Sequence, residues 1–552
     1  MSKYYITTAI PYANAAPHIG TAMDYLYGDI LLRYQTEILK NEALMSIGTD
    51  EHGAKIAQKA ADQGLTPQEF VDNLQPEFVK MRKAMNLDFD HIVNVRTTDP
   101  DHVRRVQEIW RKLDAAGVIY KSTYEGWYCV GCEAFLTETE AKSINYTCPD
   151  HNKPLEKISE DNYYLKVSKF TEQIRDFAAN NIVPAWRGKE ILELIKNGAQ
   201  DVSISRPKEK LTWGIPVPDD DSQVMYVWVD ALSNYITALG YPDNNVIASA
   251  TKQSNDCHSE LVSESSKENA EILKQVQDDN SMDFWPADVQ IIGKDILRFH
   301  AIIWPAILLA LGLDLPKKIL VHGHILNGGA KMSKSLGNVV SPLEIIEKYG
   351  TDAFRYYFSR HIPTFDDGDF TWEKFENAYN GELANDLGNL VSRVANMVKK
   401  YWNGDLTKVD KSILGFFGYD HNHNRIRKNH PYGYYYAGTD KETSEKAKDT
   451  NEMEQLNING WIDSDWVYIQ NMNKYIDDKR PWSLAKDDNT KELSEVLSKL
   501  VNGILELPGY IAPYMPETFS KIREIFGGEK LPDEIPILFP KKYLHTTAPK
   551  HQ

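Results

Sequence analysis

The sequence is poor in cysteine and in long apolar runs. Four cysteines occur in 552 residues, and three of them lie close together, which favours a local site in a reducing compartment over a disulfide framework. The longest uncharged apolar stretch, Ala301–Leu313, contains a proline and a glycine and is shorter than the ~20 residues of a membrane span. Pro11 and polar residues interrupt the N-terminal stretch, so we expect no signal peptide, no membrane contact and a cytoplasmic location.

Positive charge is also scarce, because 62 basic residues face 79 acidic ones and the net charge is −17. This balance excludes a protein coated in positive charge to hold nucleic acid indiscriminately, but it leaves room for RNA recognition by a few side chains. Neither the dinucleotide-binding glycine fingerprint nor a Walker loop is present, so a site that uses phosphate has to be built another way. The length predicts about three to four domains.

The N-terminal part alternates strands and helices. Residues Tyr4–Ile10 are β-branched and aromatic and predict a strand, and Ile19–Leu39 has the pattern of an amphipathic helix. A second short strand over Ala43–Ile47 is followed by the polar loop Thr49–Gly53 and another helix. This order is typical of a parallel sheet, in which ligands lie at the carboxyl ends of the strands.

The composition then changes at several points. Residues 124–206 are rich in Tyr, Cys and turn signals and look like an insertion, the α/β alternation returns after them, and from 377 the sequence is mainly helical. Two polar stretches, 243–283 and 411–451, are predicted surface insertions. A metal site in His421, His423 and His430 is the less favoured alternative to a solvated loop. The predicted segments are 1–123, 124–206, 207–325, 326–376 and 377–552.

The first chemical signature runs from Pro11 to Gly20, between a strand and a helix. His18 lies at the helix start, where unpaired backbone N–H groups and the helix dipole favour an anion. Gly20 would let a nucleotide approach the backbone. The plainer alternative is a histidine that caps or packs the helix.

The second signature is the stretch Gly328–Gly337. Lys331 and Lys334, with Ser333 between them, form a donor-rich clamp for phosphate on a loop that glycines make mobile. A basic solvated loop is the alternative, and it is the usual explanation for a lone lysine pair.

Together, His18-Ile-Gly and Lys331-Met-Ser-Lys-Ser resemble the paired signatures of class I aminoacyl-tRNA synthetases. Further stretches narrow the resemblance to the methionyl-tRNA synthetase family. They are Ile6–Tyr12, Gly48–Gly53, Tyr226–Leu232, and Gly293–Asp295 with His300. The likeness covers most of 1–240 and 284–400 and reappears at 466–516. Thr21 closes the first signature where the family usually has a second histidine or another polar residue, and its hydroxyl is a smaller, neutral donor to phosphate.

The resemblance implies an α/β fold in several parts. A Rossmann-like parallel-sheet catalytic domain would comprise 1–123 and 207–325, with a zinc-bearing connective subdomain inserted at 124–206. A signature-loop and stem-contact region would cover 326–376, and an α-helical anticodon-binding bundle 377–552. The implied reaction activates methionine with ATP, assisted by Mg²⁺, and then transfers the methionyl group to tRNA.

The resemblance also assigns site residues. His18, Lys331 and Lys334 would be catalytic, and Asp50 would hold the α-ammonium of methionine. Arg206 would contact the activated intermediate. The implied ATP-binding residues are Pro17, His18, Gly20, Thr21, Lys331, Ser333 and Lys334. The implied methionine pocket comprises Ile10, Tyr12, Asp50, Trp228, Tyr235 and His300, whose aromatic edges suit a soft sulfur atom. Without the resemblance, Trp228 and Tyr235 would be core residues, Asp50 a loop or helix cap, and Arg206 part of a surface ion pair.

A third pattern is Cys129-Val-Gly-Cys132 followed by Cys148-Pro-Asp-His151. Thiolates at this spacing converge on tetrahedral Zn²⁺ with His151 as the nitrogen ligand, and four protein ligands indicate a structural site. A redox cysteine pair is the less favoured alternative. The pattern resembles the single zinc knuckle of some methionyl-tRNA synthetases, and Cys257 lies outside it.

The helical segment offers candidates for tRNA recognition. Asn389 and Arg393 share one helix face, and both match family positions that recognise the methionine anticodon, as does Trp482. Such side chains suit single-stranded bases, which are recognised by aromatic stacking and by hydrogen bonds to their edges. A core tryptophan is the alternative for Trp482. We expect methionine tRNA, initiator and elongator, as partner, and a monomer because no C-terminal dimer-forming domain is evident.

Three alternative classes of protein fit the sequence less well: another class I synthetase, a non-catalytic paralogue and a small nucleotidyltransferase. A synthetase for leucine, isoleucine or valine would carry a large editing domain, for which 124–206 is too short. The cysteine enzyme would place its zinc at the substrate thiol. A non-catalytic tRNA-binding paralogue would lose one signature, and both are present. A small nucleotidyltransferase fails on length and on the helical segment.

Overall fold

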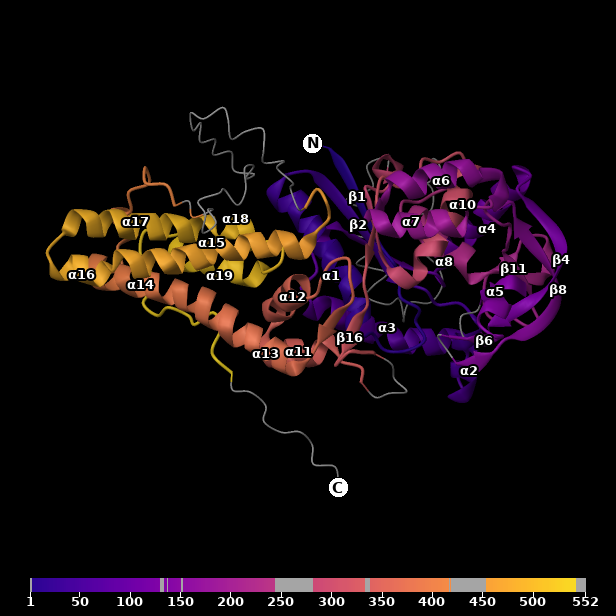
Figure 1. The fold of residues 1–552 in the computed structure, drawn as a ribbon, viewed down its shortest axis with the longest axis horizontal. Helices are drawn as coiled ribbons and strands as arrows, with labels where there is room; N and C mark the ends of the chain where they lie inside the picture. Colours follow the sequence, from indigo (N-terminus) through magenta and orange to yellow (C-terminus); the bar gives the residue numbers. More distant parts are fainter. Residues whose placement is uncertain are drawn as a thin grey trace, which may run out of the picture.

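The computed structural model describes residues 2–129, 134–136, 138–149, 152–243, 281–332, 338–415, 417 and 453–542. Figure 1 shows an elongated molecule with an α/β part at one end and a helical part at the other. Most of the two polar stretches, with the histidines considered as metal ligands, lies outside the described residues. Within the described part, no helix is both long and apolar enough to cross a membrane.

A six-stranded parallel sheet organises the α/β part, as the alternation of strands and helices predicted. Its order is β3-β2-β1-β14-β15-β9, so the strand order reverses beside β1, where Thr8 pairs with Ile291 of β14. Ligands of open α/β sheets bind at such a reversal. The strands are β1 (Lys3–Thr8), β2 (Glu42–Thr49), β3 (Ile92–Arg96), β9 (Ile182–Val183), β14 (Val289–Gly293) and β15 (Ile319–His322).

Helix α1 (Ile19–Arg33) covers one face of this sheet, and a π-helical turn, Tyr34–Ile38, continues it. The predicted helix is therefore present, but the expected amphipathic character is wrong. The helix is buried on nearly all sides because α12 (Thr351–Arg360) packs on it as well. The other α/β helices are α2 (Ala54–Asp62), α3 (Pro67–Ala84), α4 (Pro100–Ala115), α8 (Val227–Thr237) and α10 (Trp304–Ala310).

The segment after α4 forms a separate antiparallel sheet in the order β10-β8-β4-β5. It continues into two helices, and the short strand between them, β9, joins the edge of the main sheet beside β15. The elements are β4 (Ile119–Cys129), β5 (Ala134–Leu136), α5 (Glu138–Ser143), β6 (Thr147–Cys148), β7 (Lys153–Pro154), β8 (Glu156–Leu165), α6 (Thr171–Asn180), α7 (Ala185–Leu194) and β10 (Val202–Ser203). A three-stranded sheet follows, made of β11 (Ser205–Pro207), β12 (Pro216–Val217) and β13 (Asp220–Met225).

After a small sheet, the rest of the described chain is helical, as expected. A small sheet of β16 (Ile325–Asn327), β17 (Ala330–Lys331) and β18 (Gly368–Phe370) holds the base of the lysine loop, next to α11 (Pro342–Tyr349). A long helix then runs through α13 (Trp372–Ala378), a π-helical stretch (Tyr379–Gly388) and α14 (Asn389–Trp402). The bundle is completed by α15 (Ile458–Lys479), α16 (Pro481–Lys486), α17 (Thr490–Glu506), α18 (Pro508–Ile511) and α19 (Pro516–Phe526).

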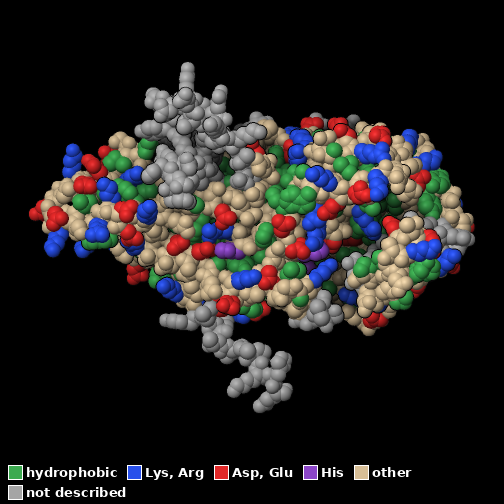
Figure 2. Space-filling model, in the orientation of Figure 1, with side chains coloured by type: hydrophobic (Ala, Val, Ile, Leu, Met, Phe, Trp, Pro, Cys, Tyr) green, Lys and Arg blue, Asp and Glu red, His purple; other side chains and the backbone are tan. Residues whose placement is uncertain are grey.

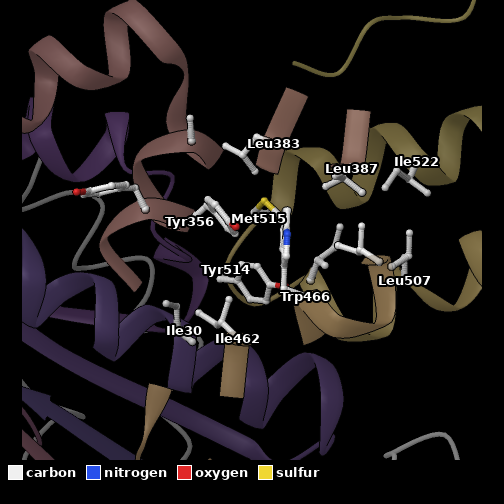
Figure 3. Close-up of a cluster of buried hydrophobic side chains, with 14 of the residues drawn as sticks. Ile30, Tyr356, Leu383, Leu387, Ile462, Trp466, Leu507, Tyr514, Met515 and Ile522 are labelled. Atoms are coloured by element: carbon white, nitrogen blue, oxygen red, sulfur yellow. The ribbon is translucent and has the colours of Figure 1, made fainter. Parts of the chain in front are cut away.

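The α/β part and the helical part share one hydrophobic core. Figure 3 shows Ile30 of α1 close to Ile462 of α15 and to Tyr514, with Tyr356 of α12 beside Met515. The same buried cluster extends from Ile6 in the sheet to Phe539 near the end of the described chain. The two parts are therefore packed as one body.

A buried group of charges sits in this shared core. Asp29 of α1 accepts from Arg33 Nε at 2.9 Å and from Arg355 Nη2 of α12 at 2.6 Å, and Asp29 and Arg355 are inaccessible to solvent. Arg355 also donates to the carbonyl oxygens of Met85, Pro513 and Tyr514. Asp29 thus contacts two guanidinium groups, of which that of Arg355 ties the α/β part to the helical part.

Replacing Asp29 should therefore destabilise the whole chain. Asp29→Asn keeps the shape of the side chain but leaves two buried guanidinium groups without their shared counter-ion, and we expect a loss of about 3–5 kcal/mol in the free energy of unfolding. Urea unfolding followed by tryptophan fluorescence measures it. Asp463→Asn, which removes the exposed partner of Arg360, should cost less than about 1 kcal/mol. Similar small losses in both variants would contradict the role of Asp29.

Candidate active site

Two loops meet at the carboxyl ends of β1 and β2, as the parallel-sheet rule predicted. Asp50 N donates to Pro11 O at 2.9 Å and Ala13 N donates to Asp50 O at 2.7 Å, so Tyr12 and Asp50 lie side by side in a short parallel bridge. The Tyr12 hydroxyl occupies the space beside Gly53, which has a φ of +124° and no room for a Cβ. The first signature and the Thr49–Gly53 loop are thus one structural unit.

A cavity of about 200 Å³ opens beside these loops and joins the two signatures. His18 and Thr21 line it from the start of α1, and Met332 and Val339 line it from the two ends of the lysine loop. Lys331 lies exposed on β17, whereas Ser333 and Lys334 lie outside the described residues. The other lining residues are Pro11, Tyr12, Asn14, Ala15, Ala16, Lys59 and Phe78.

His18 caps α1 and faces the cavity at the same time. Its Nδ1 accepts from Gly20 N at 3.0 Å, so in the neutral ring Nε2 carries the hydrogen. A Cβ on Gly20 would approach His18 Cε1 to 2.8 Å, so the glycine makes room for the imidazole. The capping role and the cavity-lining role, which sequence reasoning treated as alternatives, occur together.

An aromatic group forms where α8 meets the π-helical turn Phe299–Ile303. Tyr235 OH donates to His300 Nε2 at 2.7 Å, and His300 Nδ1 donates to Ile296 O at 3.1 Å. Trp228 stacks on Phe299 with ring centroids 3.8 Å apart and meets the edge of His300 at 6.3 Å. Phe299 was missed from sequence, although it directly precedes His300. Ile10 packs against Gly48 near the end of β2.

This aromatic group is uncharged. Burial lowers the pKa of His300 to about 4, so the ring is neutral at physiological pH, and burial raises the pKa of Tyr235 far above its ordinary value. A neutral aromatic surface suits an apolar thioether better than a charged or strongly polar side chain.

Several known proteins are similar to this chain in sequence and in structure. The family profile described as "tRNA synthetases class I (M)" matches residues 4–157 and 151–395. The methionine–tRNA ligase of Clostridium acetobutylicum is 40% identical over 94% of this chain and 73% of its own length. That of Brucella suis is 35% identical over 95% of this chain and 92% of its own length.

The chain belongs to the methionyl-tRNA synthetases. It is therefore an aminoacyl-tRNA ligase. The solved methionyl-tRNA synthetase of Mycobacterium tuberculosis in complex with methionyl-adenylate agrees at a TM-score of 0.78 and 31% identity, covering 98% of this chain and all of that one. The apo form of the same enzyme agrees at a TM-score of 0.73.

Further polar residues of this synthetase lie at the carboxyl ends of β14 and β15. His322 Nε2 is 3.2 Å from Asp24 Oδ1 of α1, and His324 Nε2 is 3.5 Å from Asp295 Oδ1. Of these four residues, only Asp295 belonged to a motif that sequence reasoning quoted. The available signal was His322-Gly-His324 at the end of a buried strand. The His322–Asp24 contact joins the end of β15 to α1.

Arg206 of β11 is buried, which excludes the surface ion pair that sequence reasoning allowed. It donates to Ser203 Oγ at 2.9 Å and to Ser205 O at 2.6 Å, and its guanidinium lies 4.4 Å from the centre of the Tyr226 ring. Tyr226 immediately precedes α8, so Arg206 packs at the base of the helix that carries Trp228. A contact with the activated intermediate stays a prediction.

Only two of the four predicted zinc ligands are described. Cys129 and Cys148 are buried in one small cluster with Ala141 and Leu155. Cys132 and His151 lie outside the described residues, and within those that are described no three His, Cys, Asp or Glu side chains gather to hold a metal. The two buried thiols fit the predicted donor set, and zinc itself stays a prediction.

The anticodon candidates of the synthetase lie in the helical part, where Figure 1 places both α14 and α16 away from the sheet. Asn389 is exposed at the start of α14, and Arg393 Nη2 pairs with Asp477 Oδ1 at 2.6 Å. Trp482 of α16 is 47% exposed, so the alternative of a core tryptophan is wrong.

The neutral state of His300 should give the stability of the chain a specific pH dependence. Its pKa is about 4 in the folded protein against an ordinary 6.5, so the unfolded chain binds more protons between these values. The contribution is present above pH 6.5 and is lost as the pH falls toward 4, by about 2 kcal/mol between pH 7 and pH 5. Urea unfolding at both pH values measures it. Glutamine does not titrate, so between pH 7 and pH 5 the His300→Gln variant should lose about 2 kcal/mol less free energy of unfolding than the wild type. Equal losses in the two proteins would contradict a buried neutral His300.

Proposed function

We propose that this chain activates methionine with ATP to methionyl-adenylate and transfers the methionyl group to the 3′ end of methionine tRNA. The observation that carries the proposal is the cavity in which His18 and Thr21 face the two ends of the lysine loop. The relatives named methionine–tRNA ligase and the neighbour solved with methionyl-adenylate support it.

In the first step, an oxygen of the methionine carboxylate attacks the α-phosphate of ATP and pyrophosphate leaves. His18 supports this role because its Nδ1 is engaged by Gly20 N, which directs the Nε2 hydrogen to an anion at the start of α1. Thr21 adds a neutral hydroxyl, and Pro17 and Gly20 shape the turn. Lys331, Ser333 and Lys334 close over the β- and γ-phosphates, which enter with Mg²⁺. In the second step, the terminal ribose of the tRNA takes the methionyl group.

Methionine itself is held at both ends. We assign its ammonium group to Asp50, since the bridge to Tyr12 fixes the loop at the cavity edge. Its thioether goes to the aromatic side formed by Trp228, Tyr235 and His300. Leucine, isoleucine and valine have no sulfur to exploit these aromatic edges.

Several finer properties belong to the proposal. Cys129, Cys132, Cys148 and His151 would hold one Zn²⁺, which would crosslink the small inserted hairpins without taking part in catalysis. We propose a cytoplasmic location, where reducing conditions would keep these cysteines as thiols. We propose a monomer whose partners are the initiator and elongator methionine tRNAs. Basic and acidic side chains are interspersed over the face seen in Figure 2, which fits recognition by a few placed residues.

The adenylation step is tested by methionine-dependent exchange between ATP and pyrophosphate. The wild type should exchange with methionine and not with leucine or cysteine. Lys334→Ala should lower the exchange kcat by a hundredfold or more, about 2.7 kcal/mol, while the Kd of methionine measured by calorimetry stays within about twofold, because the lysine loop acts on phosphate. Lys521→Ala on the exposed side of α19 is the control and should leave both unchanged. An equal loss of exchange and of methionine binding would overturn the role of the loop.

The tRNA step is tested at the far end of the molecule. Trp482→Ala should lower kcat/KM for methionine tRNA by about tenfold to a hundredfold, because base stacking on an aromatic ring is lost, while exchange stays unchanged. Trp186→Ala is a matched control, since Trp186 is 46% exposed but lies on α7. Loss of charging in both variants, or in neither, would contradict anticodon recognition by Trp482. Asn389→Ala and Arg393→Ala should behave like Trp482→Ala.

A further inference from the structure

His52 of Gly48–Gly53 and Asp230 of Tyr226–Leu232 lie in two of the quoted motifs but are not among the proposed binding or catalytic residues. Asp230 lies in α8 and is 1% exposed. Its Oδ2 is 2.7 Å from His52 Nδ1, and its Oδ1 is 2.8 Å from His102 Nε2. One buried carboxylate thus joins two imidazoles that come from distant segments of the chain.

His52 belongs to the loop that carries Asp50, and its neighbours in that loop are pinned as well. The Glu51 carboxylate accepts from Arg96 Nε at 2.9 Å, and Trp213 Nε1 donates to Glu51 O at 2.6 Å. Gly53 N donates to Trp213 O at 3.1 Å. The bond from His52 to Asp230 connects this loop to α8.

The other imidazole fixes the helix itself. His102 of α4 contacts Asp230 through Nε2, and its Nδ1 lies 2.8 Å from Thr237 Oγ1 at the end of α8. Helix α8 is thereby held to α4 at both ends of the stretch that carries Tyr235. Trp228 lies just before Asp230 on the same helix.

We infer that Asp230 is a positioning residue for methionine: by bridging His52 and His102 it fixes the loop of Asp50 relative to the helix of Trp228 and Tyr235. The inference rests on the proposed function, because it takes Asp50 as the partner of the ammonium group and the aromatic residues as the side-chain pocket. Methionine spans these two elements, so its affinity depends on their separation.

The carboxylate form is what makes the bridge. Burial alone would raise the pKa of Asp230, but the two histidines outweigh it and hold the pKa of the carboxyl below its ordinary value. Each oxygen accepts from one imidazole N–H. An asparagine of the same shape is neutral and offers one oxygen and one NH₂, so one imidazole would have to change tautomer to accept from the NH₂. Asp230→Asn therefore replaces two bonds to a buried charge by weaker neutral ones while leaving the volume of the core unchanged.

The test is steady-state ATP–pyrophosphate exchange on the full chain. Asp230→Asn should raise the KM for methionine by about tenfold or more, the loss expected for one hydrogen bond to a buried charge, and leave the KM for ATP within about twofold. ATP is spared because its cavity is built from His18, Thr21 and the lysine loop. If the wild type shows no methionine-dependent exchange, the proposed function fails. If the wild type exchanges and both KM values of the variant match it, only the positioning role fails.

Asp352→Asn provides a matched control. Asp352 is 4% exposed and accepts from Thr518 N in the helical core, so its loss weakens the fold without touching α8. It should lower the unfolding midpoint and leave both KM values unchanged. The same rise in the methionine KM in this variant would assign the effect of Asp230→Asn to general destabilisation and overturn the inference.

A second pair of variants decides the question if Asp230→Asn does not fold. His102→Gln keeps an N–H donor close to the position of Nε2, whereas His102→Leu has none. The methionine KM should stay near the wild-type value in the first and rise about tenfold in the second. Equal methionine KM values in the two variants would overturn the positioning role.

Discussion

The salt-bridged carboxylate of Asp29 is the constraint on which the rest of the molecule depends. Helix α1 begins at His18 in the cavity and carries Asp29 into the shared core, where Arg355 joins it to the carbonyl oxygens of Pro513 and Tyr514. A helix that starts at the cavity thus ends packed against the helical bundle. Because apolar side chains fill the space around these charges, the α/β part and the helical part form one body rather than two domains on a hinge.

The parts of the site that could be predicted follow from one rule. Parallel strands end at the same edge of a sheet, so the loops after β1 and β2 had to meet, and with them Tyr12 and Asp50. The pairing of the His18 signature with the lysine loop came from the resemblance to a family, and the cavity confirms that the two signatures are neighbours as far as Met332 and Val339. Lys334, Ser333, Cys132 and His151 lie outside the described residues and stay predictions.

What could not be predicted depends on contacts between distant segments. The periodicity of Ile19–Leu39 shows its apolar face but not that α12 covers the other one. Trp482 is a large apolar side chain of the kind usually found in a core, and it is exposed because it lies on a short helix at the end of the bundle. His52, His102 and Asp230 carry no motif that marks them as partners in the sequence. The two histidines meet the Asp230 carboxylate only because α4, α8 and the loop after β2 pack together.

The hydrogen bonds of His300 have a consequence for chemically altered amino acids. Its Nδ1 hydrogen goes to Ile296 O and its Nε2 receives the hydroxyl hydrogen of Tyr235, so these two residues present no hydrogen to a bound side chain. A selenium atom in place of sulfur meets the same soft, apolar surface. A sulfoxide oxygen would lose its hydration and gain no donor from this pair. At this pair of residues, the proposed methionine pocket would therefore accept either chalcogen and disfavour an oxidised one.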